Sequence, residues 1–261
     1  MAIKIEQKKK KPRRWPILVI FICVCCMGFF GYKILSISSE DNQNKQVYEQ
    51  LWQDVLLRPT EEKQKTNEAY SSPIDFESLT KTNEDAAAWL RCEGTQINFP
   101  IVQGNNNEYY LHHSIKDEWS EAGCIFLDYR NSLKFSDMQS VVFGHNFYRK
   151  DLMFTSLQNY QNQEYYEKFP KMSLYTPNAE YEIELFCGYS IDAEKYDLKL
   201  NYGDAGEFES FLKEAQDKSD FKSKVSPSST DRIFTMCTCS VTGTDRRYLV
   251  HGILKLINGE E

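Results

Sequence analysis

Short strand-like segments separated by turns dominate the sequence from residue 97 onward, and they constrain the fold more than any other feature. In one of them Tyr181 and Ile183 alternate with Glu182 and Glu184, the pattern of a half-buried strand. Apolar residues at helical spacing between 208 and 215 predict one clear helix among the strands. Many short strands with few helices predict a mainly β fold, built as a closed or nearly closed barrel. The predicted strands span residues 97–103, 124–127, 140–143, 173–176, 181–187, 233–238 and 247–256.

Two local features qualify this pattern at the start of the compact region. Asn83 can cap a short helix that continues to Leu90, with Glu84 and Asp85 in its favourable first turn. Pro100 lies inside the strand predicted at 97–103 and cannot donate a backbone hydrogen bond. We therefore expect that strand to lie at an edge or to be bulged.

The N-terminus combines a basic block with an uncharged apolar run. The first 14 residues carry seven Lys or Arg against one Glu, and Pro16 to Tyr32 contains no charge. A basic block alone could indicate nucleic acid. Here Ile34 and Leu35 extend the apolar run past Lys33, whose side chain can snorkel, so the run is just long enough for the roughly 20 residues that span a bilayer. We expect a cytoplasmic tail at 1–14 and a single-pass membrane anchor at 15–36, with the remainder extracellular and no nucleic-acid partner. A cleaved signal peptide is the alternative, although its apolar region is usually shorter.

The segment between the anchor and the compact region is predicted to be a stalk, over residues 37–73. Its first part carries an apolar helical face, formed by Val47, Leu51 and Val55 with Tyr48 and Trp52 beside it. Residues 60–73 are polar and read as a linker. A compact domain is then expected at 74–261.

The cysteine pattern argues against a disulfide scaffold. Three of the eight cysteines lie in the apolar run, and five are scattered beyond it: Cys92, Cys124, Cys187, Cys237 and Cys239. An odd number of scattered cysteines in an exported domain leaves at least one thiol free, unless two chains pair. A free thiol in that setting favours a reactive role.

Two of these cysteines share one face of a predicted strand, because Cys237 and Cys239 are two residues apart. A zinc site would need about four ligands, and neither a second cysteine pair nor a His-x3-His pattern is near. A redox bridge between strand neighbours would be strained. The third interpretation is a nucleophilic cysteine at the strand end, where the backbone is rigid and the thiol can meet substrate.

Possible partners for such a nucleophile occur in two other segments. His145 follows a strand and Gly144, which places an imidazole at a strand end. Arg246 and Arg247 begin the strand that would return antiparallel beside Cys239. An Arg there can stabilise an oxyanion and favour the thiolate. The segments that carry His145 and the two arginines could instead be ordinary surface segments. His251 and the His112–His113 pair are better explained as structural or surface residues.

The combination and order of these segments are more specific than any one of them. Gly-His-Asn at 144–146, then Thr-Cys-Ser at 238–240, then RYLVHG at 247–252 resembles the sortases. INFPIVQ at 97–103 and GCIFLDYRN at 123–131 resemble their class B branch. The resemblance covers roughly residues 75 to 257. It implies a closed barrel of about eight strands, with N-terminal helices and a helix in the connection before the last strands.

The same resemblance implies the catalytic roles. The sortase histidine falls on His145 and the nucleophile on Cys239. The catalytic arginine falls on Arg247, because the family arginine directly precedes an aromatic or aliphatic strand residue; Arg246 is the weaker candidate.

Residues that contact substrate are implied in the same way. In class B enzymes an Asn and a Leu four residues later help line the signal groove, and Asn107 and Leu111 have that spacing. Cys237 and Ser240 flank the nucleophile and are also expected to contact substrate. Cys237 departs from the family, which usually has Ser there.

The implied reaction joins two partners. A sorting signal near the C-terminus of an exported protein is cleaved after Thr through a thioester, and a peptidoglycan stem or cross-bridge amine takes the protein. No metal or cofactor is required, and no Asp-rich calcium loop is present. The alternatives are a cysteine endopeptidase that uses water, a thiol-redox protein, and a membrane-tethered binding barrel.

Overall fold

The computed structural model describes residues 15–56, 70–146, 152–193, 199–240 and 246–260. The chain divides into two compact units, Met1–Asn44 and Lys45–Glu261. The predicted cytoplasmic tail at 1–14 and most of the predicted linker at 60–73 lie outside the described residues.

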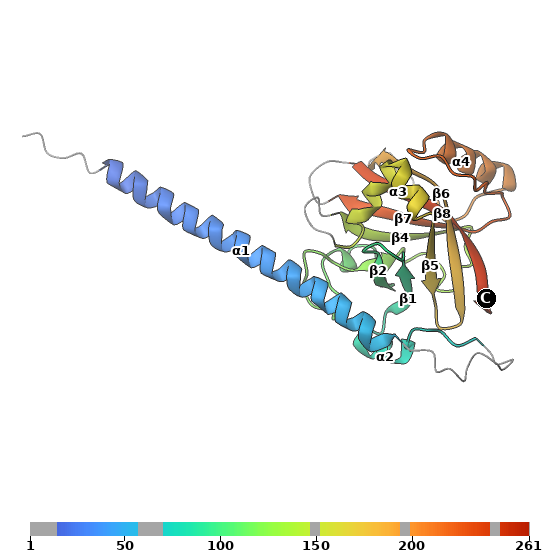
Figure 1. The fold of residues 1–261 in the computed structure, drawn as a ribbon, viewed down its shortest axis with the longest axis horizontal. Coiled ribbons are helices and arrows are strands. Elements are labelled where there is room, and N and C mark those ends of the chain that lie inside the picture. The colour runs from blue at the N-terminus through green and yellow to red at the C-terminus, as the bar shows by residue number, and fades with distance from the viewer. Residues whose placement is uncertain (1–14, 57–69, 147–151, 194–198, 241–245, 261) are drawn as a thin grey trace, which may run out of the picture. The chain divides into compact units, whose positions relative to one another are not determined.

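Unit 2 is built on a closed barrel. The eight strands of the described chain pair in the order β1-β2-β3-β4-β7-β8-β6-β5, and β5 returns to β1 (Figure 1). Two of the pairings, β2 with β3 and β4 with β7, are parallel, and the others are antiparallel. The predicted closed barrel is therefore confirmed. The strands are β1 Ala86–Arg91, β2 Asn98–Val102, β3 Ile125–Leu127, β4 Gln139–Asn146, β5 Lys171–Tyr175, β6 Ala179–Asp192, β7 Ile233–Ser240 and β8 Arg246–Gly259.

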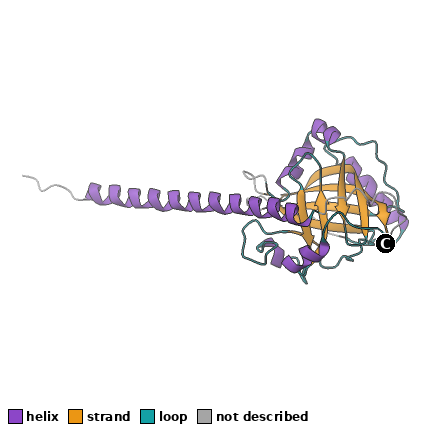
Figure 2. Ribbon diagram, turned by 60° about the horizontal axis from the view of Figure 1, so that its bottom comes forward, coloured by secondary structure: helices purple, strands orange, loops and turns teal. Residues whose placement is uncertain are grey.

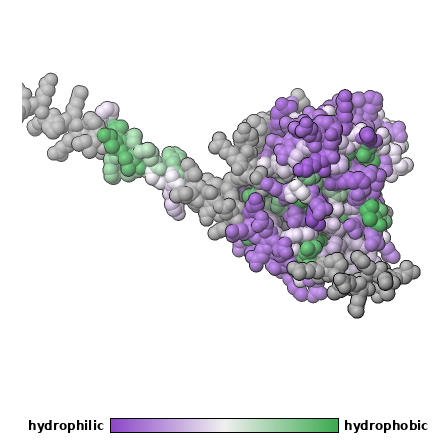
Figure 3. All heavy atoms as spheres, in the orientation of Figure 1, coloured by the Kyte–Doolittle hydropathy of each residue, from purple (hydrophilic) through white to green (hydrophobic). Residues whose placement is uncertain are grey.

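Helices pack around this barrel (Figure 2). The predicted helix before the last strands is confirmed as α4, where Asp204 caps the N-terminus and Phe208 and Leu212 are buried. The face of unit 2 seen in Figure 3 is mainly hydrophilic, since the apolar residues lie inside. The helices are α1 Trp15–Val55, α2 Phe76–Thr82, α3 Gln163–Lys168 and α4 Ala205–Asp217, with 3-10 turns η2 Tyr109–Leu111 and η3 Thr155–Gln161.

The helix predicted from Asn83 to Leu90 is wrong. The structure has strand β1 over most of that range, preceded by the short helix α2, and Asn83 is the C-cap of α2. Trp89 and Leu90 are fully buried and pair with both β2 and β5. In the closed barrel, the backbone of β1 pairs with β2 on one side and β5 on the other. These pairings outweigh the local helical preference of the alanines.

Pro100 lies in a paired strand without breaking the barrel. It pairs with Trp89 of β1, whereas the pairing of β2 with β3 begins only at Ile101. Because β2 has partners on both sides, the predicted edge position is wrong. A register shift does occur in the pairing of β1 with β2, but it lies in β1, between Ala86 and Ala88, rather than at Pro100.

The last turns of α1 belong to unit 2. Tyr48, Leu51 and Val55 are buried, with Val47 and Trp52 packed beside them. The apolar helical face predicted at these positions is thus confirmed.

The predicted membrane anchor is not supported. Among the described residues, no helix carries an apolar stretch of the length and hydropathy that a bilayer crossing requires. This finding contradicts the anchor at 15–36, membrane association through it, and the localisation as a single-pass protein with a cytoplasmic N-terminus and an extracellular catalytic domain. The uncharged run ends at Tyr32, so it reaches the roughly 20 residues of a typical span only if Ile34 and Leu35 beyond Lys33 are added, and α1 continues into a polar sequence.

Candidate active site

Three adjacent strands bring the predicted catalytic residues together. On the parallel pair β4–β7, His145 lies opposite Cys239. On the antiparallel pair β7–β8, Cys237 lies opposite Leu249. Beyond that pair the Tyr248 backbone N–H donates to the Thr238 side chain, at 2.8 Å from Oγ1. Continued in the same register, the two strands would bring Arg247 opposite Cys239.

This register explains why residues distant in sequence share a site. Residues paired across neighbouring strands occupy the same face of a sheet. The backbone positions of His145, Cys239 and Arg247 therefore share one face near the end of β7 and the start of β8. Cys239 occupies the central strand, flanked by one residue on each side.

The imidazole of His145 has a defined orientation. The side chain is buried, and the Leu111 carbonyl oxygen lies 2.7 Å from Nε2. Because a carbonyl can only accept, Nε2 carries the hydrogen. In the neutral ring, Nδ1 is then the atom that takes up a proton. The ring centroid of His112 lies 6.1 Å from that of His145, so this predicted surface histidine borders the site.

Gly144 lets β4 pack tightly beside His145. A Cβ at this position would lie 2.3 Å from Ile125 Cδ1 and 2.8 Å from Phe154 Cδ2. The Phe154 N–H also donates to the His145 carbonyl at 3.0 Å. The glycine before the histidine thus serves packing, which sets where the strand end lies.

The two arginines differ in exposure. Arg246 is exposed and pairs in register with Asp192, whereas Arg247 is half-buried and pairs with Ile191. Only Arg247 has a position on the face shared with His145, because alternate residues of a strand point to opposite faces.

Asn107 is engaged within the protein. Its amide donates to Asp128 Oδ2 at 2.9 Å, and its carbonyl oxygen accepts from the Tyr129 N–H at 3.0 Å. Arg130 holds Asp128 with two contacts of 2.9 Å. Burial acts to raise the pKa of Asp128, but the hydrogen bonds from Arg130 and Asn107 outweigh it and hold that pKa below its ordinary value. Substrate contact by Asn107 and by half-buried Leu111 remains a prediction.

Cys237 is a core residue. It is fully buried between the strand partners Phe143 and Leu249. The contribution of Cys237 and Ser240 to substrate binding remains a prediction. The cysteines whose side chains the structure describes form no disulfide. Burial raises the pKa of three of the thiols, Cys92, Cys124 and Cys187, which opposes the reactive thiolate form.

His251 is structural, as its sequence context suggested. It is fully buried, and its Nδ1 lies 2.8 Å from Thr235 Oγ1. Burial lowers the pKa of His251 to about 3. The ring therefore stays neutral near pH 7.

The sequence did not reveal the role of the turn that follows η2. The Leu111 carbonyl, rather than a side chain, orients His145, and Gly123 lies directly against that carbonyl. The only available signal was a glycine immediately before a predicted strand, which commonly marks a close backbone approach.

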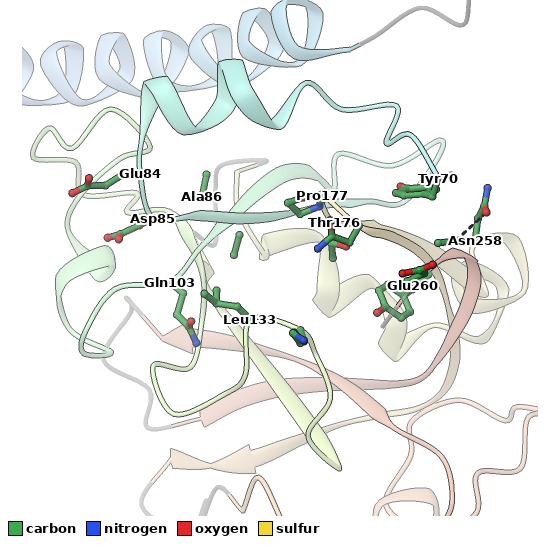
Figure 4. Close-up of a pocket in the computed structure, with 15 residues that line it drawn as sticks. Tyr70, Glu84, Asp85, Ala86, Gln103, Leu133, Thr176, Pro177, Asn258 and Glu260 are labelled. Atoms are coloured by element: carbon green, nitrogen blue, oxygen red, sulfur yellow. Dashed lines mark hydrogen bonds between the residues drawn. The ribbon is translucent and has the colours of Figure 1, made fainter. Parts of the chain in front are cut away.

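A cavity of about 820 Å³ lies at the other end of the barrel (Figure 4). Its walls include Ala86 at the start of β1, Thr176 in the β5–β6 turn, and Asn258 near the end of β8. Because β8 begins beside Cys239 and ends at this cavity, the cavity is separate from the catalytic positions.

Comparison with known proteins yields clear relatives, although no family model matches the chain. Sortase B of Listeria monocytogenes is 32% identical over 211 residues, which cover 81% of this chain and 84% of the relative. Sortase B of Staphylococcus aureus is 30% identical over 240 residues, covering 91% and 96%. The structure of the S. aureus sortase B–substrate complex aligns with a TM-score of 0.72 at 26% identity, over 87% of this chain and 100% of that one. Clostridium perfringens sortase B aligns with a TM-score of 0.64 at 34% identity, over 69% and 98%.

Proposed function

Since this chain belongs to the sortase B family and is an enzyme of the sortase cysteine transpeptidase type, we propose that it cleaves a sorting signal after Thr and transfers the cleaved protein to a peptidoglycan amine. The signal lies near the C-terminus of the substrate protein. The proposal assigns Cys239 as nucleophile, Arg247 as oxyanion donor and His145 as general acid and base.

One observation carries this proposal. The strand pairing supports the assignment: His145 lies opposite Cys239 on β4 and β7, and Arg247 lies near the start of β8, which pairs with β7 as far as Cys237 and Leu249. Thiol chemistry on a carbonyl needs a proton carrier and a donor for the oxyanion close to the sulfur. The histidine side chain can carry the proton, and the arginine side chain can donate to the oxyanion.

In the acylation step, the Cys239 thiolate attacks the carbonyl carbon of the Thr residue. The carbonyl electron pair moves to oxygen, and the Arg247 guanidinium donates hydrogen bonds to the resulting oxyanion. Its positive charge also favours the thiolate over the thiol. When the tetrahedral intermediate collapses, the C–N bond breaks and His145 gives a proton to the leaving amine. The product is a thioester between Cys239 and the substrate protein.

In the transfer step, an amine attacks the thioester carbonyl. His145 now takes a proton from the attacking amine, the C–S bond breaks, and Cys239 leaves as thiolate. The Leu111 carbonyl holds the Nε2–H, so this proton passes through Nδ1. A sortase B structure similar to this chain has been solved in complex with triglycine, which supports a peptide amine as the acceptor class.

The test is amine-dependent product formation. The full chain is incubated with a panel of Thr-containing C-terminal peptides, with and without triglycine, and the products are separated by mass. We expect an amide between the fragment ending in Thr and triglycine, and no such product from Cys239→Ala or His145→Ala.

The products distinguish a transpeptidase from an endopeptidase that uses water. Equal hydrolysis with and without triglycine, and no amide, would identify an endopeptidase that uses water. Cleavage that persists in Cys239→Ala would refute the assigned nucleophile.

A further inference from the structure

We propose that Gly123 and the turn 112–123 are positioning elements for His145, acting through the Leu111 carbonyl. This inference rests on the proposed function, in which His145 carries the proton, and it adds residues that do not touch substrate.

Two consecutive carbonyls at the end of η2 have different partners. The Tyr110 carbonyl accepts from the backbone N–H of Cys124, at 2.9 Å, just before β3. The Leu111 carbonyl accepts from Nε2 of His145 at 2.7 Å. Carbonyls at a helix end lack partners within the helix and are available for such contacts. The first contact fixes η2 against the barrel, and the second orients the imidazole.

The approach of these two segments requires a glycine. Gly123 has φ +60°, and a Cβ on it would lie 2.4 Å from the Tyr110 oxygen and 2.6 Å from the Leu111 oxygen. Both atoms belong to the backbone, so no side-chain rotation can relieve the clash. Any other residue at 123 must displace the Leu111 carbonyl or move the start of β3.

The intervening turn is ordered by its own hydrogen bonds. The Ser120 N–H donates to the His112 carbonyl at 2.9 Å, and the Gly123 N–H donates to the Ser120 carbonyl at 3.1 Å. Ser120 Oγ accepts from the Ala122 N–H at 3.2 Å. Ser120 and Ala122 are both buried, so little freedom remains in the backbone that carries Gly123.

The Leu111 carbonyl has a defined chemical effect on His145. A hydrogen bond accepted from Nε2–H selects the tautomer in which Nδ1 carries no proton, and it stabilises the protonated ring more than the neutral one. Among the described residues, the other titratable groups near His145 include His112 on the turn, Cys239 on the adjacent strand β7 and, one strand further, Arg247 on β8; the Gly123 change leaves all three in the chain. Displacing the carbonyl should therefore weaken the hold of His145 on its proton without removing a substrate contact.

The experiment compares Gly123→Ala with Gly94→Ala. Gly94 also has positive φ, +77°, but a Cβ there would meet only the Phe169 ring, with 2.9 Å as the closest approach. This control therefore has similar backbone strain and no contact with the Leu111 carbonyl. We expect Gly123→Ala to lower kcat about 10- to 100-fold, the size of effect that a small misplacement produces. KM should change little, and the alkaline limb of the pH–rate profile should move to lower pH. Gly94→Ala should retain the wild-type kcat and profile.

A milder variant and a spectroscopic measurement keep the test decisive. If Gly123→Ala does not fold, Ser120→Ala, which removes the Oγ acceptor of the turn, should give a smaller change in the same direction. The ring ¹⁵N shifts of His145 should report the Nε2–H tautomer in the wild type and a mixture in Gly123→Ala. The proposal fails if the folded variants keep the wild-type kcat and tautomer, or if Gly94→Ala loses as much. An inactive wild type that still shows the tautomer change would count against the proposed function and in favour of this inference.

Discussion

The buried His251 makes a quantitative prediction about acid stability. A directional network surrounds it: Tyr202 O–H donates to Gln139 Oε1, and Gln139 Nε2–H donates to Thr235 Oγ1. The Thr235 hydroxyl in turn forms a hydrogen bond with His251 Nδ1. A second proton on the His251 ring would place a charge in this buried site, beside the Tyr189 ring. The perturbation is the change His251→Asn, which keeps a side chain that can form a hydrogen bond with Thr235 and removes the titration.

The magnitude follows from the pKa of His251 in the two states. That pKa is about 3 in the folded protein and near 6.5 in the unfolded chain. Between these values the unfolded state binds more protons, so stability is lost as pH falls through this window. Each pH unit costs about 1.4 kcal/mol. From pH 7.5 to pH 4.5 the loss is about 2.5 kcal/mol, or about 5–10 °C in Tm for a domain of this size.

Other groups also lose stability in acid, so the assay must take a difference. Asp128 and Glu184 have lowered pKa values, and their contributions disappear as pH falls toward those values. Urea unfolding at pH 7.5 and 4.5 gives four free energies of unfolding for wild type and His251→Asn. We expect the wild type to lose about 2.5 kcal/mol more than the variant over this range. Equal losses would refute the neutral, buried histidine.

Three further predictions concern the active site. Gly144→Ala brings a Cβ within 2.3 Å of a neighbouring side chain; it should destabilise by about 1–3 kcal/mol in urea unfolding and also lower kcat. Cys237→Ser should lower peptide turnover far less than Cys239→Ala, because Cys237 is a core residue; equal losses would favour a thiol-redox role. Arg247→Lys should lower kcat about 100-fold, as loss of an oxyanion donor does, whereas Arg246→Lys, at an exposed position, should leave kcat unchanged in the same turnover assay.

The strands near the site were predictable because their patterns are local. The segments at 140–143 and 233–238 read as apolar strands, and the structure extends both to His145 and Cys239. The return of β8 beside β7 followed from the short connection between them. The parallel pairing of β4 with β7 could not be predicted from pattern, because it depends on how the whole barrel closes.

The failures have separate physical origins. Ala86 to Leu90 has local helical preference, but this segment completes the hydrogen bonding of the barrel on two sides. The contact between the Leu111 carbonyl and His145 involves a backbone atom, which carries no sequence signature. The membrane anchor was inferred from an apolar run near the minimum length, where a small shortfall reverses the conclusion.

The central claim is that Cys239 forms a thioester with the substrate, and peptide mapping of the acyl-enzyme tests it most directly. The full chain is mixed with a Thr-containing signal peptide without an amine acceptor, quenched in acid, digested and analysed by mass spectrometry. The account predicts that the peptide containing Cys239 gains the mass of the acyl fragment ending in Thr, and that hydroxylamine removes it. An adduct on Cys237, or cleavage of the signal with no adduct and no effect of Cys239→Ala, would contradict the account.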